Sequence, residues 1–107
     1  MLLLKEALGA TTTTDYFHVN ANGKFWIDLS GTWGGGTITM KRALTQTLAE
    51  AGTFADFYPD GTLATFTANG VHEYEVPIGT CYRFASDGSI SDVDIYVGGH
   101  AVKPGGQ

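Results

Sequence analysis

The sequence of 107 residues contains one cysteine, few charged residues and no long apolar run. Cys81 cannot form a disulfide within the chain, and it lies in an apolar segment where a buried, inert thiol is expected. Redox and metal-thiolate roles are therefore disfavoured. The apolar run at the start ends at Lys5, which makes it too short for a membrane span or for the core of an export signal. We expect a protein made in the cytoplasm, not exported from it and not bound to a membrane.

Positive charge is scarce, with 6 Lys and Arg against 11 Asp and Glu and a net charge of -5. Lys41 and Arg42 form the single basic pair, whereas binding to nucleic acid needs many cations gathered on one face. The sequence thus predicts no nucleic-acid partner. Because charged residues make up only 16% of the chain, much of the surface must be uncharged and polar, which is common on proteins that pack against others.

No catalytic or metal-binding pattern stands out. His18, His72 and His100 lie in separate segments, far from the spacing of a zinc site, and no nucleophile elbow is present. Asp92 and Asp94 share one face of a strand, where a weak calcium site is conceivable, but acidic alternation on a solvent-facing strand needs no ion and is the favoured interpretation. Glycoside hydrolysis would need two carboxylates across a cleft. We expect a protein that is not an enzyme and has no cofactor or metal.

What the chain does contain is a series of short alternating segments separated by turn residues. Residues 63–68, 71–76, 81–85 and 91–97 alternate apolar and polar side chains, as half-buried strands do. Gly23, after Asn22, predicts a tight hairpin, and the three glycines at 34–36 predict a second one. Seven or eight such strands imply an all-β fold, namely an antiparallel two-layer β-sandwich that is jelly-roll-like.

Changes in composition along the chain predict where the arm, the sandwich and the tail begin and end. Residues 1–14 are predicted to form an N-terminal arm and a Thr-rich link, residues 15–98 the sandwich, and residues 99–107 a flexible tail. The arm could pack on its own domain or dock on a neighbouring subunit. Residues 43–51 fit either a helical face or a strand, and we expect a strand that continues into a loop.

Five residues are candidates for contact with a partner. Trp26 alternates with Phe25 and Ile27, so it should face outward, and Trp33 beside three glycines is the best candidate for an exposed anchor. The other three are the apolar residues of the arm, Leu2, Leu3 and Leu4. The aromatic content could instead form a sugar-binding platform, although aromatic residues in small sandwiches more often lie in the core.

Three stretches resemble small β-sandwich virion proteins of tailed bacteriophages. They are Ser30-Gly31-Thr32-Trp33-Gly34-Gly35-Gly36-Thr37-Ile38-Thr39-Met40, Thr67-Ala68-Asn69-Gly70-Val71 and Val76-Pro77-Ile78-Gly79-Thr80-Cys81-Tyr82-Arg83-Phe84. The resemblance covers about residues 25–97 and rests on turn and strand patterns. This chain departs from the resemblance at residues 42–52, where family members carry a shorter glycine-rich turn.

The resemblance implies a capsid decoration or cement protein in the phage particle, made in the bacterial host cytoplasm. Its partners would be the major capsid protein and further copies of itself, as a trimer or dimer that also protects sheet edges. An alternative is a carbohydrate- or receptor-binding module of a tail fibre or baseplate, which would use Trp26, Trp33 or Tyr96. A third is a head-completion or tail-tube component.

Overall fold

Ten strands and one short helix make up the computed structural model, which describes residues 2–20, 23–99 and 102–104. Several of the longer strands alternate more buried and less buried side chains, as the sequence predicts. They are β1 (Leu2–Leu8), β2 (Phe17–Val19), β3 (Lys24–Thr32), β4 (Ile38–Ala43), β5 (Ala55–Asp56), β6 (Thr65–Phe66), β7 (Gly70–Glu75), β8 (Cys81–Ser86), β9 (Asp92–Gly98) and β10 (Val102–Pro104); the helix is α1 (Gln46–Glu50).

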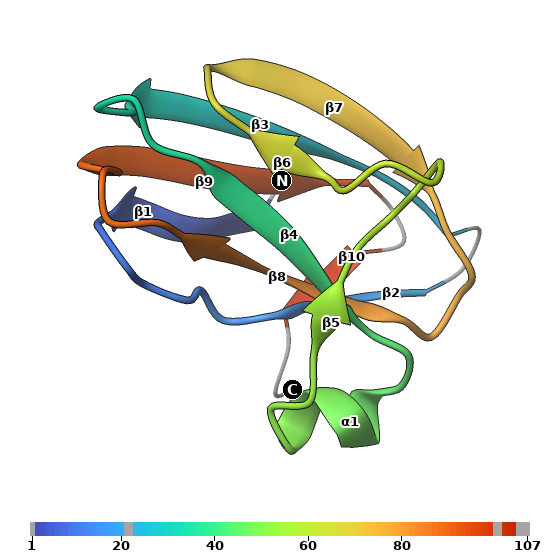
Figure 1. Ribbon diagram of the computed structural model, residues 1–107. Coiled ribbons are helices and arrows are strands. Elements are labelled where there is room, and N and C mark those ends of the chain that lie inside the picture. Colours follow the sequence, from blue (N-terminus) through green and yellow to red (C-terminus); the bar gives the residue numbers. More distant parts are fainter. Residues whose placement is uncertain (1, 21–22, 100–101, 105–107) are drawn as a thin grey trace.

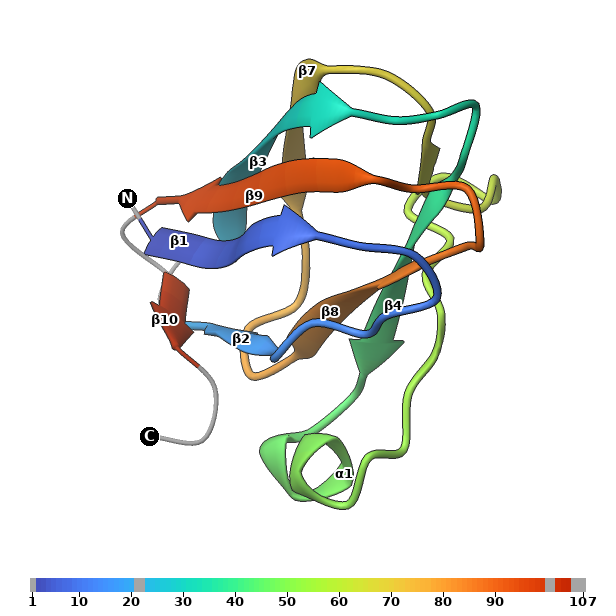
Figure 2. The same ribbon diagram turned by 90° about the vertical axis from the view of Figure 1, so that its left-hand side faces the viewer.

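The strands form two antiparallel sheets that pack face to face (Figures 1 and 2). One sheet has the order β1-β9-β3-β7, and the other has the order β10-β2-β8-β4-β5, with β6 also paired to β4. The predicted all-β antiparallel sandwich is therefore confirmed. The chain passes back and forth between the layers and interleaves early and late strands, which is the strand order of a jelly roll.

Apolar residues from both inner faces fill the space between the sheets. Phe25, Ile27 and Leu29 point inward from β3, and Phe17, Tyr82 and Phe84 meet them from the other layer. Phe17 and Phe25 lie edge to face, with 5.3 Å between ring centroids, which is a favourable geometry for aromatic pairs. This packing fixes which side chains of each strand face solvent.

The two predicted hairpins are wrong, although the turns exist. Gly23 donates its N–H to the Asn20 carbonyl at 3.1 Å, but β2 and β3 then enter different sheets. The glycines after Trp33 likewise lead from β3 across the sandwich to β4. A strand that follows a tight turn can bury its apolar face by joining the opposite sheet. The turn alone therefore does not require the two strands that flank it to pair with each other. Asn22 lies outside the described residues.

The N-terminal segment is a sheet strand rather than a separate arm. β1 pairs with β9 along its length, and Leu8 is fully buried. The Thr-rich link is also fixed: Thr14 N donates to the Phe84 carbonyl at 2.9 Å, and its hydroxyl accepts from Phe84 N at 3.0 Å. Leu8 lies in the core and Leu4 packs against it, which corrects the predicted boundary at residue 14.

The C-terminal boundary changes in the same way. β10 pairs with β2, in the register Val102 to Val19, so part of the predicted tail belongs to the six-stranded sheet. Residues 100–101 and 105–107 lie outside the description.

Residues 43–51 contain a helix, not the predicted strand and loop. Thr45 caps α1, accepting from Leu48 N at 3.2 Å, and Ala49 is buried against Ala43 and Cys81 on the outer side of the six-stranded sheet. Ala49 is the buried residue of α1, whereas Leu44 and Leu48 remain exposed, so the helical spacing of these leucines does not form a buried face.

Candidate functional site

The outer face of the four-stranded sheet carries the most distinctive surface group, centred on Trp26. The inner face of β3 is occupied by Phe25 and Ile27, so Trp26 points away from the core, as predicted. It is half-buried, and the sheet register places Glu73 of β7 on one side of it and Gly98 of β9 on the other.

The Trp26 indole packs against the backbone at Gly98. A Cβ atom added at Gly98 would overlap the six-membered ring of Trp26, so the ring lies directly over the β9 backbone at this point. Only glycine allows so close an approach. Sequence patterns do not predict this contact, because the pairing of β9 with β3 depends on tertiary structure.

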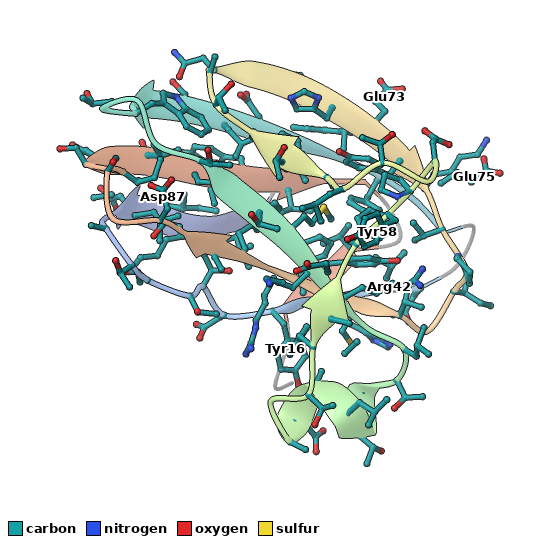
Figure 3. All side chains as sticks on the ribbon, viewed as in Figure 1. Tyr16, Arg42, Tyr58, Glu73, Glu75 and Asp87 are labelled. Carbon is teal, nitrogen blue, oxygen red and sulfur yellow. The ribbon has the colours of Figure 1, made fainter. Side chains whose placement is uncertain are left out.

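Carboxylates surround Trp26. Asp28 follows it on the outer face by the strand repeat of two, and Glu73 and Glu75 project from β7 beyond the sandwich (Figure 3). Glu75 forms an ion pair with Lys24 at 3.4 Å, with both side chains largely exposed. Lys24 offsets one of the carboxylates of Asp28, Glu73 and Glu75, so this group keeps a net negative charge.

An open groove runs beside the indole. Its volume is about 490 Å³, and it is lined by Lys24, Phe25, Trp26, Glu73, Tyr74, Glu75 and Gly99. Burial raises the pKa of the Tyr74 hydroxyl, and the nearby carboxylate of Asp60 raises it further, so the phenol is a neutral hydrogen-bonding group at physiological pH. An aromatic face, a phenol and carboxylates suit stacking and hydrogen bonding with a sugar or contact with a cationic side chain.

Trp33 is not the exposed anchor that its glycine neighbours suggest. Its side chain is only 9% exposed and packs into the core, and its Nε1 donates to Asn69 Oδ1 at 2.8 Å. The three glycines shape the turn, while the indole folds back beneath it. The prediction for Trp33 is wrong because removing a large apolar ring from water stabilises the folded protein, whereas exposing the ring on the turn would not.

The three leucines of β1 have different environments. Leu3 is 40% exposed and pairs with Tyr96 of β9, while Leu4 packs against the core. Leu2 pairs through its backbone with Val97. Leu3 and Trp26 therefore lie on strands flanking β9 in one sheet, but the predicted five residues do not form a single site.

The acidic pair of β9 has a structural contact. Asp94 Oδ1 accepts from Ala7 N at 2.9 Å, at a point where Ala7 has a φ of 52° and β1 changes register. His72 packs against Phe66, with 4.7 Å between ring centroids, and His100 lies outside the description. Among residues 2–20, 23–99 and 102–104, no group of three potential ligands gathers to hold a metal ion.

Cys81 is fully buried beneath Ala49 of α1. Loss of hydration raises the pKa of its thiol to about 11, and the carboxylate of Glu50 adds to the effect. The thiol therefore stays protonated at neutral pH, as expected for an inert cysteine.

Within the described part of the chain, no helix has both the length and the apolar character needed to cross a lipid bilayer.

Comparison with known proteins finds no matching family and no curated protein of significant similarity. Two solved structures show a loose likeness, and both are described as pentameric capsid proteins isolated from metagenomic phage sequences. The first is 14% identical with a TM-score of 0.39, covering 92% of this chain and 62% of that one. The second is 13% identical with a TM-score of 0.35, covering 85% and 59%. This chain thus spans about six tenths of their length, and at TM-scores this low neither likeness bears on fold or function.

Proposed function

We propose that the protein is a non-enzymatic structural protein of a tailed-phage particle, and that it binds the outer capsid surface as a decoration or cement protein. Its partners would be the major capsid protein and further copies of itself, in a trimer or dimer. It would be made in the cytoplasm of the bacterial host and act in the virion.

The jelly-roll strand order is the observation that carries this proposal. The sequence resemblance to phage virion proteins implies a β-sandwich, and the two sheets have the interleaved order found in many viral capsid domains. This is an analogy at the level of the fold, since jelly rolls also serve lectins and cupins.

The pairing of β1 and β10 within the sheets agrees with a structural role. β1 pairs with β9 and β10 pairs with β2, so both terminal strands are built into the sheets. A cement protein gains its overall affinity from many equivalent copies, and each copy must present its contact surface in a fixed geometry. A sandwich with paired terminal strands meets that need.

The test is the copy number of the protein in purified particles, measured by quantitative mass spectrometry against the major capsid protein. A ratio near one to one, or another simple fraction set by the capsid lattice, supports a decoration protein. Only a few copies per particle would assign it to the tail or a fibre, and its absence would refute a virion role. Added to particles that lack it, the protein should raise their heat resistance.

Trp26 supports a second candidate, a carbohydrate- or receptor-binding module of a tail fibre or baseplate. Its indole lies over Gly98 beside an open groove with hydroxyl and carboxylate groups, as in a sugar-stacking site. Titration of the intrinsic tryptophan fluorescence with host polysaccharide tests it. Quenching that disappears in Trp26→Ala would favour the module, whereas no response to any cell-surface glycan would exclude it.

A further inference from the structure

The two sheets have four edges, and these differ sharply in their ability to accept another strand. β1 changes register twice and contains Ala7 at positive φ, so its edge is irregular. β10 has three residues and ends in Pro104, which has no N–H to offer. β5 and β6 have two residues each. Irregular, short or proline-bearing edges are the usual protection against unwanted pairing.

β7 lacks these protections. Its six residues pair with β3 in unbroken register, from Gly70 opposite Leu29 to Glu75 opposite Lys24. It is the outermost strand of its sheet, and within residues 2–20, 23–99 and 102–104 no strand pairs with its far side (Figure 1). A regular strand of this length offers about 20 Å of backbone donors and acceptors to an incoming segment.

The side chains of β7 define two different faces for such a segment. On the outside, Val71 is 61% exposed, and Glu73 and Glu75 are also exposed. On the inside, His72 and Tyr74 are half-buried against the aromatic core, with Tyr74 lying 5.6 Å from Phe57 between ring centroids. The inner side chains of an added strand would therefore extend the core, while the outer ones would lie beside the carboxylates of Glu73 and of Glu75, the second of which also pairs with Lys24.

The negative charge of β7 determines which kind of strand can pair with its free edge. Two copies of the chain joined through β7 would bring Glu73 and Glu75 of one copy beside those of the other, and like charges on paired strands are destabilising. Asp60, which lies close enough to Tyr74 to raise the pKa of its hydroxyl, adds to the negative field. A strand with lysine or arginine on its outer side is attracted instead.

We propose that the free edge of β7 binds an extended segment of another protein in which lysine or arginine alternates with apolar residues. The segment pairs with the β7 backbone, places its basic side chains beside Glu73 and Glu75, and covers His72 and Tyr74 with its apolar ones. This inference concerns one edge of the sandwich and does not depend on the proposed role in a virion.

The experiment titrates the full chain, labelled with ¹⁵N, with a peptide of about eight residues that alternates lysine and valine, the length of a strand able to span β7. We expect chemical-shift changes and slower amide hydrogen exchange centred on β7. A peptide that alternates glutamate and valine should not bind. Equal binding of both peptides, no binding of the lysine peptide, or changes centred on β1 would overturn the proposal.

Two matched controls separate backbone pairing from simple charge attraction. Glu73→Gln should weaken binding of the lysine peptide several-fold, while Asp92→Asn, which removes an exposed carboxylate from β9 of the same sheet, should change it little. Equal loss in both variants would mean general attraction to an acidic surface and would refute the site.

The second control N-methylates alternate residues of the peptide, which blocks hydrogen bonding along one edge of an extended strand. Of the two possible alternating patterns, one should abolish binding and the other should leave it intact, because only one peptide edge meets β7. If both patterns bind as well as the unmodified peptide, no strand is added and the proposal fails.

Discussion

Trp33 and Asn69 join two distant turns through one hydrogen bond. The indole Nε1 of Trp33 donates to Asn69 Oδ1 at 2.8 Å, and the same oxygen accepts from Gly31 N at 2.9 Å. Trp33 follows β3, and Asn69 directly precedes β7. The amide therefore ties the connection that leaves β3 for the second sheet to the connection that returns from it.

Asn69→Ala should lower the free energy of unfolding by about 1–3 kcal/mol, because it leaves the largely buried Trp33 N–H and the Gly31 N–H without their acceptor. Denaturant unfolding followed by tryptophan fluorescence measures this. Asn69→Asp keeps an oxygen acceptor and should lose much less stability. Equal stability of Asn69→Ala and the wild type would mean that water replaces the amide.

Leu8→Ala should destabilise the protein by about 2–5 kcal/mol, since Leu8 is fully buried and its removal leaves a cavity in the core. Leu3→Ala is the matched control on the same strand: Leu3 is 40% exposed, and its truncation should cost well under half as much. Thermal unfolding of both variants gives the comparison. If both were harmless, β1 would be a dispensable arm after all.

Gly98→Ala should displace the Trp26 indole, because the added methyl group would occupy the space of the ring. A cost of about 1–3 kcal/mol is expected for such overpacking, together with a shift of the Trp26 indole N–H signal in NMR spectra while the Trp33 signal stays in place. Gly88→Ala is the control, since a Cβ there would meet its nearest atom at 3.8 Å. An unmoved Trp26 signal in Gly98→Ala would contradict the stacking.

The free energy of unfolding should fall as the pH rises from 9 towards 11. The pKa of the Cys81 thiol is raised from 9.0 to about 11 in the folded protein, so below pH 9 the thiol is protonated in both states and stability is complete. Above that, the unfolded chain ionises first, and about 2–3 kcal/mol is lost by the time the pH passes the folded pKa.

Denaturant titrations across this pH range measure the effect, and Cys81→Ala should remove its cysteine component. The raised pKa of the Tyr82 hydroxyl, caused mainly by burial, acts in the same direction at higher pH and remains in that variant. An identical pH dependence in Cys81→Ala and the wild type would exclude the thiol as its source.

The strand patterns predicted individual elements more reliably than their pairing. Trp26 was correctly placed on an outer face because Phe25 and Ile27 flank it in a strict repeat of two, which depends only on local geometry. The hairpin at Gly23 was wrong because a turn fixes the reversal of the chain but not the sheet that the next strand joins. The outward direction of Trp26 could therefore be predicted from the sequence, but its neighbours on the adjacent strands, Gly98 and Glu73, could not.

By itself, the sequence determined an all-β chain with half-buried strands, an acidic surface and a buried cysteine. The alternation of side chains is a property of each short segment, and charge and residue content are sums over the chain, so neither depends on contacts between distant residues. Only the tertiary structure decided that Trp33 is buried, that Trp26 rests on Gly98, that β1 belongs to the sheet and that β7 is a regular free edge. Those outcomes depend on contacts between residues far apart in the chain, where burial of apolar area against the opposite layer outweighs local preference.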